Sequence, residues 1–141
     1  MVNYPLWNNP PTYPASFECN PMPTLSDDTA NPLLDMRGLP RFGAIRPEHV
    51  EPALDRLLAE SRALLERAVA ANSEYTWDNL VQVIEDMGER LSRMWSPVAH
   101  LNAVMNSEAL RTAYNACLPK LTEFGTALKQ DERLYRAYKA I

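Results

Sequence analysis

The sequence is poor in the residues that build most metal and redox sites. Its 141 residues include only two cysteines, Cys19 and Cys117, and two histidines, His49 and His100. The cysteines lie far apart and match no metal-ligand spacing, so we expect two free thiols, with Cys117 a small core residue. Such sparse cysteine use excludes a disulfide framework and fits a reducing compartment.

The two histidines lack the partners that a catalytic site needs. The sequence contains neither H-E-x-x-H, which places two imidazoles on one helix face, nor a Glu-x-x-His pair for a di-iron bundle. We expect His49, beside Glu48, to be solvated or to cap a helix, and His100 to be a hydrogen-bonded structural residue. The sequence therefore assigns no catalytic residue, no cofactor-binding residue and no metal ligand to this chain.

Glycine, long apolar runs and runs of like charge are also scarce. Four unclustered glycines exclude a glycine-rich phosphate loop, and no serine or cysteine lies in a recognisable nucleophile signature. No apolar run approaches the ~20 residues that span a bilayer, and the N-terminus does not have the pattern of a standard secretory signal. A net charge of -4 without a basic cluster argues against nucleic-acid and membrane partners.

Proline is abundant, and it is concentrated at one end. Residues 1–46 hold eight of the twelve prolines. Proline fixes φ and removes an amide donor, so this spacing predicts a Pro-rich extended or disordered leader. Its aromatic residues leave open that it lies on an apolar groove. Within it, residues 31–35 and 39–42 are expected to settle onto the folded body.

Residues 47–141 have the apolar periodicity of a helical domain. The first helix is expected to begin at Pro47 and end near Ala71, with Pro52 causing a kink at most. Arg56–Glu60 and Arg62–Glu66 are spaced as i,i+4 ion pairs. The apolar stripe of this helix consists of Ala53, Leu54, Leu57, Leu58, Ser61, Leu64, Leu65 and Ala68.

A second helix is expected after Thr76, its natural N-cap. Gly88 lies in its middle, and a close helix crossing would explain a glycine there. Ser96-Pro97 is expected to end or bend the helix, because proline interrupts the backbone hydrogen bonds. The buried stripe is predicted to be Leu80, Ile84, Met87, Leu91 and Met94, widened by Val81, Val83 and Trp95.

Two further helices complete the domain. Ser107 is predicted to cap a helix over residues 108–129 with a kink at Pro119, and Asp131 to cap a last helix over residues 132–141. The stripe of the longer helix is Leu110, Ala113, Tyr114, Cys117, Leu118, Leu121, Phe124 and Leu128. The predicted fold class is all-α, with four or five amphipathic helices in an antiparallel bundle-like array.

Two groups of residues on the second helix could have a functional role. Glu85, Asp86 and Glu89 are paired carboxylates of the kind used in acid–base catalysis, but Arg90 and Arg93 follow them, which favours a solvated face with ion pairs. A second set could line an apolar pocket, although such residues at helical spacing usually form core: Trp77, Met94, Trp95 and Met105.

From Asn31 onward the chain resembles the N-terminal portion of the oligopeptidase A and thimet oligopeptidase family of zinc metallopeptidases. The order and spacing of several motifs match over roughly 110 residues, which is more specific than any one motif. They are Asn31-Pro-Leu-Leu34, Ile45-Arg-Pro-Glu-His-Val50, Pro52-Ala53, Tyr75-Thr-Trp-Asp-Asn-Leu80, Ser96-Pro-Val-Ala-His-Leu-Asn102, Asn106-Ser107, Leu110-Arg111 and Leu134-Tyr-Arg-Ala-Tyr138.

The resemblance implies a large helical cytoplasmic enzyme that cleaves short peptides in a deep channel with one zinc ion. The zinc elements of the family lie C-terminal to the matched segment, so the resemblance implies zinc in the full-length enzyme and no cofactor in this chain. Residues 47–141 are then a truncated N-terminal part that forms channel wall and is non-catalytic alone. Its expected partner is the missing catalytic portion, or a second copy through exposed apolar helix faces. The alternative is a free-standing helical interaction module.

Overall fold

The described part of the chain is entirely helical apart from its loops. The computed structural model describes residues 31–70 and 74–141. Its elements in order are η1 (Phe42–Ala44), α1 (Pro47–Ala70), η2 (Trp77–Val81), α2 (Gln82–Val104), α3 (Glu108–Lys129) and α4 (Glu132–Lys139). No strand occurs in these two ranges, and the all-α prediction is confirmed. Residues 1–30 of the predicted leader 1–46, and residues 71–73, lie outside the described residues.

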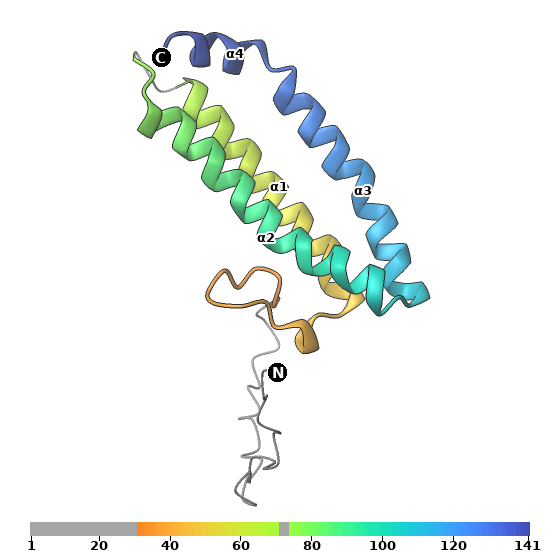
Figure 1. The fold of residues 1–141 in the computed structure, drawn as a ribbon. Coiled ribbons are helices and arrows are strands. Elements are labelled where there is room, and N and C mark those ends of the chain that lie inside the picture. The colour runs from red at the N-terminus through yellow and green to blue at the C-terminus, as the bar shows by residue number, and fades with distance from the viewer. Residues whose placement is uncertain (1–30, 71–73) are drawn as a thin grey trace, which may run out of the picture.

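The three long helices run up, down and up again (Figure 1). α1 and α2 lie side by side as an antiparallel pair, and α3 returns alongside α1. The short α4 turns back across the end of the bundle where α1 ends and η2 begins, and it contacts both. The arrangement is therefore an antiparallel bundle closed at one end by a short helix.

The three N-caps expected from the sequence are present. The Thr76 hydroxyl accepts a hydrogen bond from Asn79 N at 3.2 Å, and the Asn79 side chain accepts one from Thr76 N at 2.9 Å, forming a capping box. Ser107 Oγ accepts from Leu110 N at 3.2 Å, and Asp131 accepts from two amides of α4. Each side chain satisfies amide donors that the first turn leaves unpaired. The turn after Thr76 is π-helical before α2 becomes regular, a detail that the periodicity did not predict.

Three prolines lie inside helices rather than at their ends. α1 begins at Pro47 as expected and continues past Pro52, and α3 continues past Pro119. Of the two expectations for Ser96-Pro97, an end to the helix is wrong, because α2 runs from Gln82 to Val104 through Pro97. Pro97 and Val98 are buried in the bundle, and this packing offsets the loss of one backbone hydrogen bond.

The main core lies where α1 faces both α2 and α3. The predicted stripe of α1 is buried apart from Leu64, which is half-buried. The buried members of this core cluster are Leu33, Val50, Ala53, Leu54, Leu57, Leu58, Met87, Met94, Val98, Leu101, Leu110, Cys117 and Phe124. A smaller cluster fixes α4 against the end of α1 and η2: Leu65, Ala68, Val69, Leu80, Leu134 and Ala137.

The segment before α1 packs on the bundle at several points, but not along its whole length. Leu33 is 4% exposed in the main core, and Asn31 Nδ2 donates to the His49 carbonyl at 2.7 Å. Leu39, in contrast, is 89% exposed, and the Phe42 ring is partly exposed. Residues 31–35 therefore settle on the body as expected, whereas Leu39 extends into solvent.

Candidate functional site

The two histidines occupy ordinary structural positions at the same end of the molecule. His49 Nδ1 accepts a hydrogen bond from Arg46 N at 3.1 Å, which caps the first turn of α1 in the manner expected. His100 on α2 is exposed, and its ring meets Phe42 edge-on with centroids 5.6 Å apart. A ring contact thus takes the place of the hydrogen bond expected for His100.

The four apolar residues considered as a pocket do not come together. Met94 is fully buried, and Trp95 is half-buried and stacked on Tyr114 with ring centroids 4.8 Å apart. Trp77 and Met105 are 61% and 71% exposed, so the expectation that they are core is wrong for both. Trp77 is the first residue of η2 and Met105 directly follows α2, so the two residues lie at opposite ends of the second helical segment, η2 and α2 together.

Cys117 is a buried free thiol, as expected for a core residue. Burial is the largest cause that raises the pKa of this thiol, and the nearby Glu51 carboxylate adds to it. Lys120 Nζ contacts Asp55 Oδ1 at 2.6 Å and Glu51 Oε1 at 2.8 Å, and these contacts raise the pKa of Lys120. The cluster joins α3 to α1, and the raised pKa of Cys117 disfavours the nucleophilic thiolate.

The acidic cluster on α2 is a solvated face. Glu89 pairs with Arg93 at 3.7 Å, and Asp86 accepts from Gln82 Nε2 at 2.7 Å. Arg90 reaches across to Glu60 of α1 at 2.7 Å instead of pairing within its own helix. Of these contacts, only the Arg90–Glu60 pair joins two helices. The exposed carboxylates have no arrangement that indicates acid–base catalysis.

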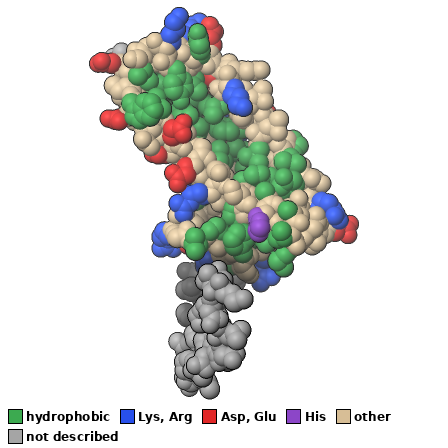
Figure 2. Space-filling view, viewed as in Figure 1, with side chains coloured by type: hydrophobic (Ala, Val, Ile, Leu, Met, Phe, Trp, Pro, Cys, Tyr) green, Lys and Arg blue, Asp and Glu red, His purple; other side chains and the backbone are tan. Residues whose placement is uncertain are grey.

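An apolar groove lies between α2 and α3. It has a volume of about 620 Å³, and its lining residues are Gln82, Ile84, Glu85, Asp86, Met87, Gly88, Glu89, Leu91, Ser92, Leu121, Phe124, Gly125 and Leu128. We call this the α2–α3 groove. A continuous band of hydrophobic surface follows the length of the molecule on this face (Figure 2).

The half-buried residues of the predicted stripes account for this groove. Ile84 and Leu91 on α2, and Leu121 and Leu128 on α3, all line it and are only half-buried. Deeper side chains, Met87 among them, are buried beneath them. Periodicity marked these positions as apolar, but it could not tell that the groove between the helices would remain open.

Gly88 does not mark a close crossing of helices. A Cβ built at Gly88 or at Gly125 would meet no atom within 4 Å, and both glycines line the α2–α3 groove. The expectation of a close contact within this chain is therefore wrong. The missing side chains widen the groove instead.

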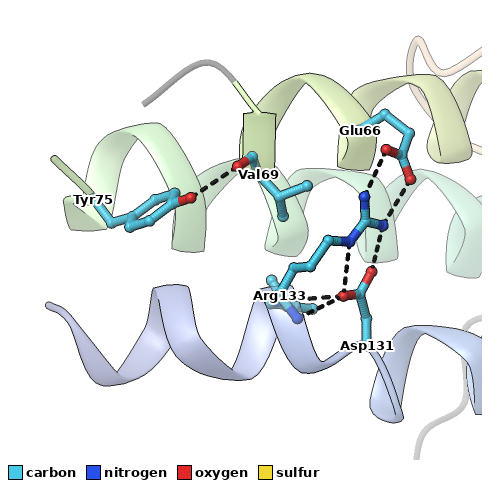
Figure 3. A network of polar contacts seen from close by, with 6 residues as sticks. Glu66, Val69, Tyr75, Asp131 and Arg133 are labelled. Carbon is cyan, nitrogen blue, oxygen red and sulfur yellow. Dashed lines mark hydrogen bonds and ion pairs between the residues drawn. The ribbon is translucent and has the colours of Figure 1, made fainter. Parts of the chain in front are cut away.

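An ion-pair network holds α4 to α1 (Figure 3). Both amino groups of Arg133 donate to the Glu66 carboxylate at 2.8 Å, and Arg133 also contacts Asp131 at 2.8 Å. The hydrogen bond from Arg133 is the largest cause that lowers the pKa of each carboxylate. The predicted Arg62–Glu66 pair is wrong, because Arg62 lies over the Phe124 ring at 5.6 Å, whereas the Arg56–Glu60 pair is present at 2.9 Å.

Comparison with protein families matches most of the chain to one family. The family model of the neurolysin and thimet oligopeptidase N-terminal domain matches residues 53–141. The chain belongs to this family.

Relatives of the chain include three oligopeptidases. It is 45% identical over 112 residues to oligopeptidase A from Haemophilus influenzae, and 48% identical over 109 residues to oligopeptidase A from Escherichia coli. These matches cover 79% and 77% of this chain but only 16% of each relative. The probable cytosolic oligopeptidase A of Arabidopsis thaliana is 36% identical over 118 residues, which is 82% of this chain and 17% of that protein. The chain therefore spans about one sixth of the length of these relatives.

The donors in the described residues do not fit the zinc site that the family resemblance implies. In residues 31–70 and 74–141, no group of three or more His, Cys, Asp or Glu side chains is placed to hold a metal ion. His49 uses Nδ1 to cap α1, and Cys117 is enclosed in the core. No step of zinc chemistry can be assigned to these side chains. Separately, none of the helices in these ranges is both long and apolar enough to cross a membrane.

Proposed function

We propose that this chain is the N-terminal helical segment of an oligopeptidase A-like zinc peptidase, in which it forms part of the channel wall and supplies no catalytic group. The observation that carries the proposal is the family match over residues 53–141, together with a span of only 16% of the bacterial relatives. A sequence with two histidines and no H-E-x-x-H supports a structural role. The substrates of the whole protein would be short peptides.

The architecture is consistent with a structural role. Most buried side chains are aliphatic, and several ion pairs join one helix to another. Such a bundle supplies rigid shape, and any chemistry would come from elsewhere in the polypeptide. The proposal places the protein in the cytoplasm, supported by its sparse cysteines and by the name of the Arabidopsis relative.

The test is cleavage of a quenched fluorogenic peptide by the purified chain. We expect no cleavage by the chain alone, with or without added zinc. Cleavage by the chain that a chelator abolishes would contradict the proposal. A reading frame that continues from this segment to an H-E-x-x-H motif would support it, whereas a chain encoded and expressed without such a continuation would favour the free-standing interaction module.

A further inference from the structure

The α2–α3 groove is an unfilled packing site rather than an irregular surface. Its apolar lining comes from two facing helices, and four of its aliphatic side chains are half-buried: Ile84, Leu91, Leu121 and Leu128. Apolar side chains that line a continuous band are costly to leave in water, since burying such surface stabilises by roughly 25 cal/mol per Å². Exposed apolar bands of this kind are typical of interaction surfaces and ligand grooves.

Two glycines give the groove its shape. Gly88 lies on α2 and Gly125 on α3, and neither would bring a Cβ within 4 Å of another atom of this chain. Glycine in a helix interior costs about 0.5–1 kcal/mol relative to alanine, and inside this chain nothing compensates that cost. An element from outside could approach the backbones of α2 and α3 closely at these positions.

The rim of the groove is charged on one side. Glu85, Asp86 and Glu89 line the α2 edge. Among the described residues, Glu85 and Asp86 form no ion pair, and only Glu89 has a cationic partner, Arg93. An occupant with lysine or arginine along the matching edge would be attracted to this rim.

The groove favours a helix over an extended peptide. Both of its walls are helices, whose interior backbone groups are already paired within α2 and α3. An extended segment would find no strand edge to bind and would leave its own backbone groups unpaired in the apolar part. A helix satisfies its own backbone and presents only side chains.

We infer that the α2–α3 groove receives an amphipathic helix with a basic edge, supplied by the part of the polypeptide that lies outside the segment matched here. The relatives are about six times as long as the matched region, so such polypeptide is available in them. The inference rests on the proposed function, because it requires that the remainder of an oligopeptidase-like protein packs on this chain. The groove is then the principal docking surface between the two parts.

The experiment combines the tagged chain 1–141 with the part of Escherichia coli oligopeptidase A that follows its matched segment, co-expressed as a separate polypeptide. We expect a complex that can be isolated and that cleaves a fluorogenic peptide. Gly125→Leu and Gly88→Leu should each weaken the complex at least tenfold. Replacing Glu85, Asp86 and Glu89 together by lysine should weaken it as well, most strongly at low salt.

The controls separate loss of docking from loss of folding. Gly43→Leu is the matched control, because Gly43 also has open space at its Cβ but does not line the groove. It should bind within twofold of the unsubstituted chain. Gly125→Leu and Gly88→Leu, each without a partner, should melt at the same temperature as the unsubstituted chain or higher, because leucine is a better helix former than glycine.

Each outcome distinguishes the groove from the proposed function. An active complex that forms equally well with Gly125→Leu and Gly88→Leu would overturn the groove as docking site while leaving the proposed function intact. Failure of the unsubstituted chain to form any complex would count against the groove as docking site and also against the proposed function. A dimer of the chain alone that Gly125→Leu dissociates would assign the groove to a second copy. Binding of an extended peptide to the chain, abolished by Gly125→Leu, would assign the groove to a peptide. Either of these two results would overturn the proposal that a helix occupies the groove.

Discussion

Side chains that cap the helix ends help to determine where the helices of this fold begin. The capping box at Thr76 ties the loop before η2 to its first turn, and Asn79 Nδ2 also donates to the Glu74 carbonyl at 3.0 Å. Because the loop reaches the bundle through these bonds, the cap sets where the second long segment begins. Its hydroxyl is therefore a sensitive position although it lies on the surface.

Replacing Thr76 by alanine should lower the free energy of unfolding by about 1 kcal/mol, because the first turn loses its side-chain acceptor. Urea denaturation followed by circular dichroism measures the change. Thr76→Ser retains the hydroxyl and should remain within about 0.5 kcal/mol of the unsubstituted chain. Equal losses for alanine and serine would mean that the threonine methyl group, and not the cap, stabilises this end.

The stability of the chain should fall in acid, and Arg133 should account for part of the fall. The pKa values of Asp131 and Glu66 are lowered in the folded chain, first by their hydrogen bonds from Arg133. Their contribution is thus complete above the unfolded pKa values of about 4, and it is lost as the pH falls through the lower folded values. Urea midpoints measured from pH 7 down to pH 2.5 should show this decline.

Arg133→Gln should flatten that acid-dependent decline, because both carboxylates lose the cation that favours their ionised form. Arg136→Gln is the control and should leave the decline unchanged, since among the described residues Arg136 pairs only with Glu132, on an exposed surface of α4. An unaltered profile in Arg133→Gln would show that other carboxylates, such as Glu60 and Asp35, govern the acid response; their pKa values are also lowered.

At the scale of the elements, the backbone conformation of each glycine decides the effect of its substitution. Gly88→Ala should stabilise the isolated chain by about 0.5–1 kcal/mol, because alanine is a better helix former and its Cβ meets open space. Gly38→Ala should destabilise it by about 1–2 kcal/mol, because φ at Gly38 is +67°, a left-handed conformation. Thermal midpoints of the two variants should shift in opposite directions. A destabilising Gly88→Ala would mean that the α2–α3 groove is closed in solution.

The elements themselves were largely predictable. α1 and α3 begin where Pro47 and the Ser107 cap placed them. The stripe of α1 faces the core, and so does that of α3 except at Leu118, which was predicted to belong to it and is exposed. The prediction that the helix could end at Ser96-Pro97 was wrong. A lost hydrogen bond is a local cost, whereas the burial of Pro97 depends on neighbours distant in sequence. Arg62–Glu66 failed for a similar reason: i,i+4 spacing permits a pair, but Arg133 and Phe124 offer each residue a tertiary partner.

At the scale of the whole molecule, the two core clusters divide the bundle into a large body and a small end. α4 is held by Leu134 and Ala137 in the smaller cluster and by the Arg133 ion pairs. Leu134→Ala should cost about 2–5 kcal/mol, because it leaves a cavity in the smaller cluster. Hydrogen exchange should show the largest loss of protection in α4.

Tyr135→Ala serves as the comparison for Leu134→Ala. Tyr135 is a neighbour in the same helix but is 65% exposed, and its removal should change stability by less than about 0.5 kcal/mol. Loss of protection confined to α4 in Leu134→Ala would mean that the smaller cluster opens independently of the body. Equal effects of the two substitutions would contradict the assignment of Leu134 to the core.

The sequence by itself determined the helical class, the caps and the apolar stripes, because each depends on residues that are close together in the chain. It also determined the family resemblance, which depends on the order and spacing of motifs along the chain. It also determined that no H-E-x-x-H is present. Only the tertiary structure decided which stripe positions are fully enclosed and which remain open along the α2–α3 groove. That choice depends on how closely α2 and α3 approach each other, a relation between distant segments that neither periodicity nor propensity contains.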